Sequence, residues 1–266
     1  FSFDFPIGTA IWHALFHSVS SFNNAGFIVL PGAGLSAYHE DPSVLLVTAA
    51  LFFLGGISIV VMADVFRQRR FGRLSLDSKI VLSVTGGIVA LSMLFFLITE
   101  WDNPATLGEL GLPGKLLTAF FEPVSARTAG FKTISVGNLT QSTLVFTMAL
   151  MFVGGAAAST TGGIKVNSFG VIIASVIATL RGRPRVEAFK REIPAHQVSM
   201  ALTLGVLAAM GVFVTAIVLV RLEDARFIDL LFETVSAFGT SGYSTGLTAE
   251  MSNWGQLLLV GAMYLG

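Results

Sequence analysis

Three short stretches of the sequence resemble one another: residues 16–27 (FHSVSSFNNAGF), 121–131 (FEPVSARTAGF) and 232–243 (FETVSAFGTSGY). Each runs from an aromatic residue through a Val-Ser pair to a glycine and a second aromatic residue, and each lies beside an apolar segment long enough to cross a bilayer. In a motif of small residues the backbone is accessible to a ligand, and backbone carbonyls can replace the hydration shell of a cation. The repeat therefore predicts an ion pore.

Composition places the chain in a membrane. Hydrophobic residues make up 53% of the 266 positions and charged residues only 12%, which lies well outside the balance of soluble domains. The formal net charge is zero and no basic run resembles a nucleic-acid-binding arm, so we expect no nucleic-acid partner. Cysteine is absent, which excludes disulfides and cysteine-based metal sites within these residues.

Length identifies the membrane-crossing segments, because a hydrocarbon core of about 30 Å needs about 20 apolar helical residues. Residues 43–66, 80–99 and 197–220 meet this requirement. Residues 139–180, as one helix, would be roughly 63 Å long at about 1.5 Å per residue, so this segment has to break. The glycines and small polar residues of 154–165 (GGAAASTTGGIK) mark the break. Irregular backbone at membrane depth has to face protein or water, so we expect this loop to face an interior path.

The charged connections predict the orientation. Ten of the sixteen Lys and Arg residues fall in two connections, 67–79 and 181–191, which the positive-inside rule places in the cytoplasm. The acidic connections then lie outside, and all three glycine motifs lie on the outer side. Residues 7–22, 114–126 and 227–239 are apolar but too short to span, the size expected of half-crossing pore helices.

The strings SFNNAGF, SARTAGF, SAFGTSGYSTGLT and STTGGIK, in this order, resemble the Ktr and Trk potassium uptake proteins of bacteria, and the resemblance covers essentially the whole chain. It implies an all-α membrane protein whose helix, pore-loop, helix repeats surround one pore with pseudo-fourfold symmetry. Residues 1–66 would be the second repeat from its pore helix onward, 67–180 the third repeat, and 181–266 the fourth, truncated in its last helix. The first repeat is expected to lie outside the chain.

The resemblance also implies a selectivity filter whose carbonyl oxygens bind potassium. A glycine at each turn permits positive φ, so that successive carbonyls point at one axis. The expected walls are Asn24, Ala25, Gly26 and Phe27; Thr128, Ala129, Gly130 and Phe131; and Thr240, Ser241, Gly242 and Tyr243. The third of these is the most similar to the filter of tetrameric potassium channels.

The break at 154–165 resembles the intramembrane gating loop of the same family. The expected gate residues are Gly154, Gly155, Ser159, Thr160, Thr161, Gly162, Gly163 and Lys165. Lys165 has two interpretations of equal weight: a cation close to the path, or a lysine that snorkels to the inner membrane edge.

Several polar or small residues have structural explanations. Arg127 is a charge inside a filter motif and needs a buried partner, for which Glu122 and Glu233 are the candidates; a structural pair is favoured over a direct role. The pairs Gly55–Gly56 and Gly86–Gly87 are interpreted as helix-packing positions. His13 and His17 lack an acidic residue to complete a metal site, so an anchoring role for His17 in its pore helix is favoured.

The functional prediction is potassium uptake across the bacterial plasma (inner) membrane by a multi-pass transporter that is not an enzyme and holds no cofactor, with sodium as an open candidate for a coupling or activating ion. The resemblance implies a homodimer regulated by a cytoplasmic nucleotide-binding ring, which the basic connections would meet, although topology alone explains their charge equally well. The alternative is a secondary transporter for another monovalent cation such as sodium. Carriers commonly have inverted repeats, whereas these motifs share one side. A membrane enzyme would need ionisable groups at membrane depth, and the spans carry almost none.

Overall fold

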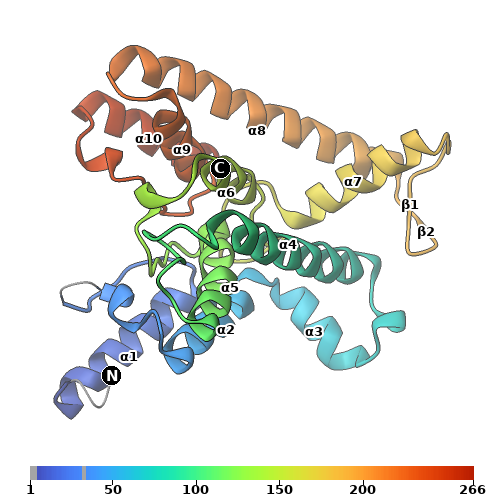
Figure 1. The fold of residues 1–266 in the computed structure, drawn as a ribbon. Coiled ribbons are helices and arrows are strands. Elements are labelled where there is room, and N and C mark those ends of the chain that lie inside the picture. Colours follow the sequence, from blue (N-terminus) through green and yellow to red (C-terminus); the bar gives the residue numbers. More distant parts are fainter. Residues whose placement is uncertain (1–4, 32–33) are drawn as a thin grey trace.

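The computed structural model describes residues 5–31 and 34–266, and nearly all of its regular structure is helical (Figure 1). The helices of the described residues are α1 (Ile7–Phe22), α2 (Pro42–Gly56), α3 (Ile59–Gln68), α4 (Leu76–Glu100), α5 (Leu112–Thr128), α6 (Gln141–Phe152), α7 (Val166–Leu180), α8 (Ala195–Leu222), α9 (Phe227–Phe238) and α10 (Asn253–Leu265). A small hairpin pairs β1 (Glu187–Ala188) antiparallel with β2 (Arg191–Glu192).

Two helices of the described residues, α4 and α8, are long and apolar enough to cross a membrane, and a third crossing exists if the bent pair α2 and α3 counts as one. Helix α8 has 28 residues, so it is about 42 Å long at about 1.5 Å per residue. Helix α4 begins with a capped turn, because the hydroxyl of Ser75 accepts from the N–H of Ser78. These helices give an all-α membrane protein.

The expected span over 43–66 is found as two helices rather than one, because the chain bends by 98° between α2 and α3. Gly55 and Gly56 weaken the helix at this point, Ile57 adopts an extended conformation, and the side chain of Ser58 caps the new helix by accepting from the N–H of Val60. Because α2 ends here, the carbonyls of Gly55 and Gly56 become available to other parts of the chain.

The predicted break within 139–180 is confirmed. Helix α6 ends at Phe152 and α7 begins at Val166. The two ends of the connection pair across its neck, where the N–H of Gly154 donates to the carbonyl of Ile164 (2.9 Å) and the N–H of Ile164 to the carbonyl of Phe152 (3.2 Å). Residues 154–165 therefore form a loop that is closed at its base between two helices. The name intramembrane loop, taken from the prediction, is kept for it below.

Helices are found at the three places where half-crossing helices are expected, and α1, α5 and α9, with 16, 17 and 12 residues, keep that name below. Helix α5 packs between α2, α4 and α6, and α9 packs between α6, α8 and α10. The largest buried cluster joins Phe96 of α4, Met151 of α6 and Phe232 of α9 with Tyr243. The core therefore holds the half-crossing helices and the glycine motifs that follow them against the longer helices.

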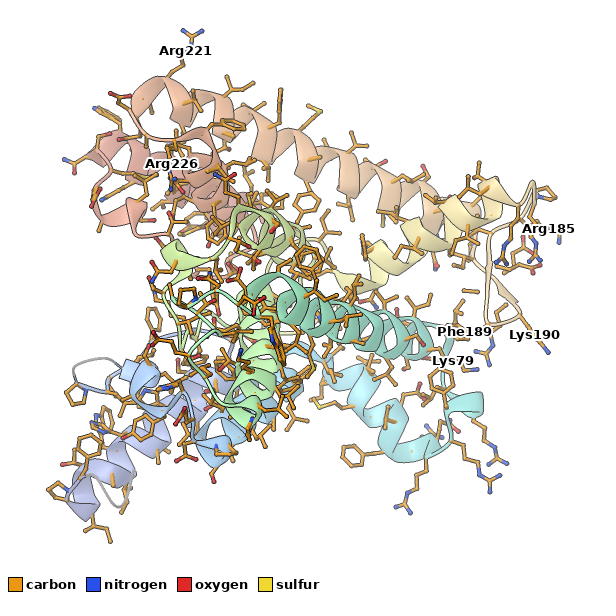
Figure 2. The ribbon with its side chains drawn as sticks, in the orientation of Figure 1. Lys79, Arg185, Phe189, Lys190, Arg221 and Arg226 are labelled. Atoms are coloured by element: carbon orange, nitrogen blue, oxygen red, sulfur yellow. The ribbon has the colours of Figure 1, made fainter. Side chains whose placement is uncertain are left out.

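The two basic connections lie at the same end of the molecule. Phe71 and Phe189 pack edge to face with 5.8 Å between ring centroids, which brings residues of both connections into contact. Figure 2 shows Lys79, Arg185 and Lys190 near Phe189 at this end, with Arg221 and Arg226 toward the opposite end of α8. Both basic connections thus lie at one end of the molecule, which is called the basic face below.

Cysteine labelling tests which face is cytoplasmic. These 266 residues contain no cysteine, so each single substitution at an exposed position adds one labelling site, and the unsubstituted full-length protein measures the background. We expect a membrane-impermeant maleimide to label Asp102→Cys in intact cells and to label Arg70→Cys and Arg185→Cys only after permeabilisation. Labelling of Arg70→Cys in intact cells with protection of Asp102→Cys would reverse the orientation.

Candidate functional site

The glycines of the three motifs meet at one place. Gly26, Gly130 and Gly242 have φ of +71°, +77° and +76°, a conformation that L side chains rarely adopt. A Cβ on Gly130 would lie 2.7 Å from the carbonyl oxygen of Ser241, 3.4 Å from the Cα of Gly26 and 3.6 Å from the Cα of Gly242. A Cβ on Gly26 would lie 2.7 Å from the carbonyl oxygen of Ala129. The second wall therefore lies between the other two, with backbone against backbone.

The serine of each Val-Ser pair holds the end of its own wall. Its hydroxyl donates to the carbonyl of the aromatic residue that follows the glycine. The three bonds run from Ser20 to Phe27 (2.9 Å), from Ser125 to Phe131 (2.5 Å) and from Ser236 to Tyr243 (2.5 Å). This bond fixes the peptide just beyond the glycine. Sequence reasoning missed this role, although the constant place of the serine in all three motifs was the available signal.

A difference in length between the motifs has a backbone explanation. The second motif is one residue shorter than the others. In the two longer motifs Asn24 (φ +51°) and Thr240 (φ +49°) adopt the left-handed conformation although neither is a glycine. The resulting turn accommodates the additional residue. This conformation is costly for a β-branched residue such as Thr240, and strain of this kind gathers at functional sites.

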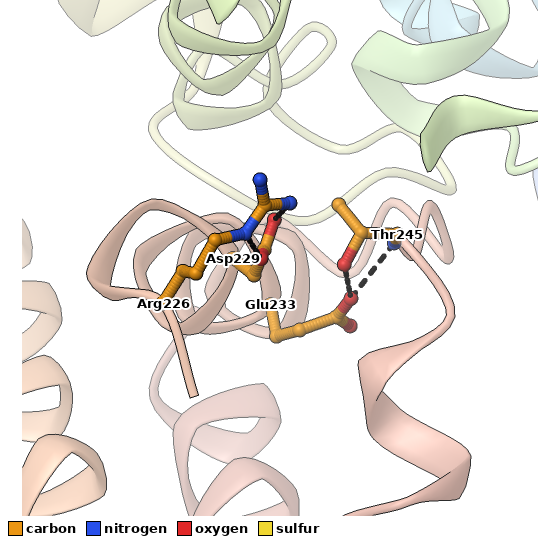
Figure 3. Close-up of polar contacts among 4 residues, drawn as sticks. All are labelled: Arg226, Asp229, Glu233 and Thr245. Atoms are coloured by element: carbon orange, nitrogen blue, oxygen red, sulfur yellow. Dashed lines mark hydrogen bonds and ion pairs between the residues drawn. The ribbon is translucent and has the colours of Figure 1, made fainter. Parts of the chain in front are cut away.

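Glutamates of two half-crossing helices hold the chain as it leaves the filter motif. The Glu122 Oε1 accepts from the N–H and hydroxyl of Thr133, both at 2.6 Å. The Glu233 Oε1 accepts from the N–H (2.8 Å) and hydroxyl (3.0 Å) of Thr245, while Arg226 pairs with Asp229 nearby (Figure 3). In α1 the corresponding residue is His17, whose Nδ1 lies 2.7 Å from the carbonyl oxygen of its own helix at His13.

The expected carboxylate partner of Arg127 is wrong. The Arg127 side chain is buried, and its Nε (3.1 Å) and Nη2 (2.8 Å) both donate to the carbonyl oxygen of Gly154. The Glu122 and Glu233 carboxylates instead accept from hydroxyl and N–H donors of Tyr243 and of the chain beyond the repeated motifs. The guanidinium therefore anchors the first residue of the intramembrane loop to the end of α5.

The intramembrane loop also touches the other two walls. The Asn24 Nδ2 donates to the hydroxyl of Thr160 (2.8 Å), and a Cβ on Gly162 would lie 2.1 Å from the hydroxyl oxygen of Thr240. The loop thus contacts the first wall at Asn24, approaches the third at Thr240, and is bonded to Arg127, the residue directly before the second wall. The predicted filter and gate residues thus come together in one site.

The bend between α2 and α3 supplies a second support for the loop. The carbonyl of Gly56 accepts from the N–H of Ala156 (3.0 Å), and that of Gly55 accepts from the N–H of Thr160 (3.3 Å). A Cβ on Gly55 would lie 1.7 Å from the carbonyl oxygen of Phe22, so this glycine permits close approach of α2 to α1, in line with a packing role.

Two predicted gate residues make hydrogen bonds within the loop. The Lys165 amine donates to the carbonyl of Thr161, while the Thr161 hydroxyl accepts from the N–H of Gly155 (2.9 Å). The Lys165 charge is therefore directed into the loop.

The glycine pair of α4 differs from expectation. Outside its own helix backbone, no described atom lies within 4 Å of a Cβ built on Gly86 or Gly87, so the packing role expected for that pair is not observed among the described residues.

Comparison with known proteins places these features in a family. A family model described as TrkH, cation transport protein, matches residues 8–266. The Ktr system potassium uptake protein B of Bacillus subtilis is 42% identical over 97% of this chain and 58% of its own length. The potassium/sodium uptake protein NtpJ of Enterococcus hirae is 35% identical over 99% of this chain and 59% of its own. The chain thus spans less than two thirds of these relatives.

A solved structure shares the fold. The crystal structure of the potassium transporter TrkH from Vibrio parahaemolyticus matches with a TM-score of 0.79 and 16% sequence identity, over 96% of this chain and 56% of that one. This similarity supports the arrangement of helices described above.

Proposed function

The chain belongs to the TrkH family of cation transport proteins, and from this membership we propose that it forms part of a potassium uptake transporter with a backbone-carbonyl filter. The observation that carries the proposal is the meeting of three glycines with positive φ, each in the same repeated motif, at one point. The relatives named above are uptake proteins and not enzymes, which agrees with the scarcity of ionisable groups in the membrane segments.

The proposed filter binds potassium through peptide carbonyls. A cation that leaves water needs a ring of oxygens, and selectivity depends on the spacing and number of those oxygens. The carbonyls of Ala129 and Ser241 each lie against the glycine of the neighbouring wall, so the residue before each glycine is where the walls come closest. We assign the ion site to this level, with the fourth wall contributed from outside these residues.

The proposed gate is the intramembrane loop beneath the filter. Because it contacts Asn24 of the first wall, Arg127 directly before the second wall and Thr240 of the third, it lies where an ion would leave the filter toward the basic face. Its contacts with these elements and with the carbonyls of Gly55 and Gly56 are hydrogen bonds, which can be exchanged for others when the loop moves aside. Transport would then require the loop to leave this position.

The remaining proposals follow from the family. We propose that residues 1–66, 67–180 and 181–266 correspond to three consecutive repeats, that the protein lies in the bacterial inner membrane as a homodimer, and that a cytoplasmic nucleotide-binding ring regulates it at the basic connections. Sodium is proposed only as a coupling or activating ion, although the Enterococcus relative is named for both ions.

Flux measurements test the proposed function. The full-length protein in proteoliposomes is expected to take up potassium and rubidium down a gradient at least about tenfold faster than sodium, a difference of about 1.4 kcal/mol. Liposomes without protein are the control. Potassium flux no greater than in those liposomes would overturn the proposal, and faster sodium than potassium flux would favour a sodium transporter instead.

A further inference from the structure

The hydroxyl of Tyr243 reaches from the third wall into the second. It lies 2.6 Å from the Glu122 Oε2 and 2.8 Å from the carbonyl oxygen of Phe131. The Tyr243 side chain is only 2% exposed. The carbonyl oxygen of Glu122 is a third acceptor at 3.2 Å, so the hydroxyl has a single proton for three acceptors, and the bond to a carboxylate is the stronger kind. The Tyr243 side chain of the third wall is thus held between Phe131 of the second wall and Glu122 of α5, the helix that leads into that wall.

The Glu122 carboxylate extends this contact to the chain just beyond the second wall. Its other oxygen, Oε1, accepts from the N–H and hydroxyl of Thr133 and, at 3.3 Å, from the N–H of Ile134. The salt bridges found among the described residues do not include Glu122, and its side chain is 2% exposed. These donors satisfy the buried carboxylate, so Glu122 joins the chain beyond the second filter motif to the aromatic ring of the third.

The same position in the other two motifs cannot make this contact. The residue after the glycine is Phe27 or Phe131, which has no hydroxyl. Glu233, the counterpart of Glu122, accepts from Ser244, Thr245 and Thr248, which all belong to the chain beyond its own motif. Of the three aromatic residues that follow the glycines, Tyr243 is therefore the one whose side chain bonds to a glutamate of another motif.

We propose that Tyr243 and Glu122 form a positioning pair that sets the separation of the second and third walls and thereby the preference for potassium over sodium. The pair rests on the proposed function, because it acts on the carbonyl filter assigned there. Neither side chain binds the ion. Potassium and sodium differ in the spacing of oxygens they require, so a wall that is free to shift accepts sodium more readily.

Removal of the hydroxyl tests the pair from one side. In Tyr243→Phe, the ratio of potassium to sodium flux in proteoliposomes is expected to fall roughly tenfold, the effect of one lost charge-assisted hydrogen bond, while the maximal rate of potassium uptake changes much less. The matched control is Tyr264→Phe, which removes the same hydroxyl from a tyrosine that is 91% exposed on α10, and it should keep the wild-type ratio.

Glu122→Gln tests the pair from the other side, and it provides the test if the Tyr243→Phe protein does not fold stably. It is expected to lower the same ratio, and the double variant should lower it no further than the stronger single variant. A wild-type flux ratio in both single variants would overturn the positioning pair and leave the proposed function intact. Absence of potassium flux in the wild-type protein would instead overturn the proposed function, and the selectivity role with it.

Discussion

Gly130→Ala is expected to abolish potassium selectivity. Gly130 has φ of +77° and lies between the other two walls, and a Cβ there would stand 2.7 Å from the carbonyl oxygen of Ser241. An alanine in this conformation costs roughly 1–2 kcal/mol, and the contact forces the second and third walls apart. We expect the potassium-to-sodium flux ratio to fall by on the order of tenfold or more, measured in proteoliposomes.

Gly182→Ala separates backbone strain from the close contact. Gly182 also has positive φ (+63°), but a Cβ there would meet no described atom within 4 Å. The substitution therefore carries a similar conformational cost in the connection between α7 and β1 without touching the filter, and its flux ratio should equal that of the wild type. Wild-type selectivity in Gly130→Ala would contradict the filter assignment.

Arg127→Gln is expected to raise potassium flux without changing selectivity. The guanidinium makes both of its hydrogen bonds to the carbonyl of Gly154, where the intramembrane loop begins. Its loss leaves that buried carbonyl without this donor, at a cost of about 1–3 kcal/mol to the position of the loop observed here. If this position blocks the pathway, the open fraction and the flux should rise roughly tenfold, since about 1.4 kcal/mol corresponds to a factor of ten.

Two further variants distinguish loss of the anchor from loss of charge. Arg127→Lys keeps the charge but offers an ammonium in place of the planar guanidinium, and we expect an intermediate flux. Arg181→Gln removes an arginine charge at the exposed end of α7 and should behave as the wild type. A potassium flux that falls in Arg127→Gln and is normal in Arg127→Lys would show that the charge matters and would contradict the anchor.

The sequence predicted the elements that repeat. The three half-crossing helices and the break at 154–165 follow from segment length and glycine content, and the structure has them at those places. The bend at Ile57 was missed because the apolar run 43–66 satisfies the length criterion and contains no proline. Its only signal was the Gly55–Gly56 pair, which helix packing explains equally well.

The partners of the polar residues were harder to predict. Arg127 bonds to a backbone carbonyl, and every residue has one, so no side-chain pattern identifies Gly154 as its acceptor. The contact of Tyr243 with Glu122 joins residues from two repeats, which requires knowledge of how the repeats pack. The glutamate-to-threonine contact was also missed, although it occurs in two motifs at nearly the same spacing, Glu122 with Thr133 and Glu233 with Thr245, and an alignment of the motifs places both pairs in register.

The location of bound rubidium tests the central claim most directly. Crystals of the full-length protein grown in rubidium, measured at the rubidium absorption edge, should show an anomalous difference peak on the axis between Gly26, Gly130 and Gly242, within coordination distance of peptide carbonyls and not of carboxylates. The peak should disappear in sodium. A rubidium peak held by side-chain carboxylates elsewhere, with no density on that axis, would contradict a carbonyl filter built from the three repeated motifs.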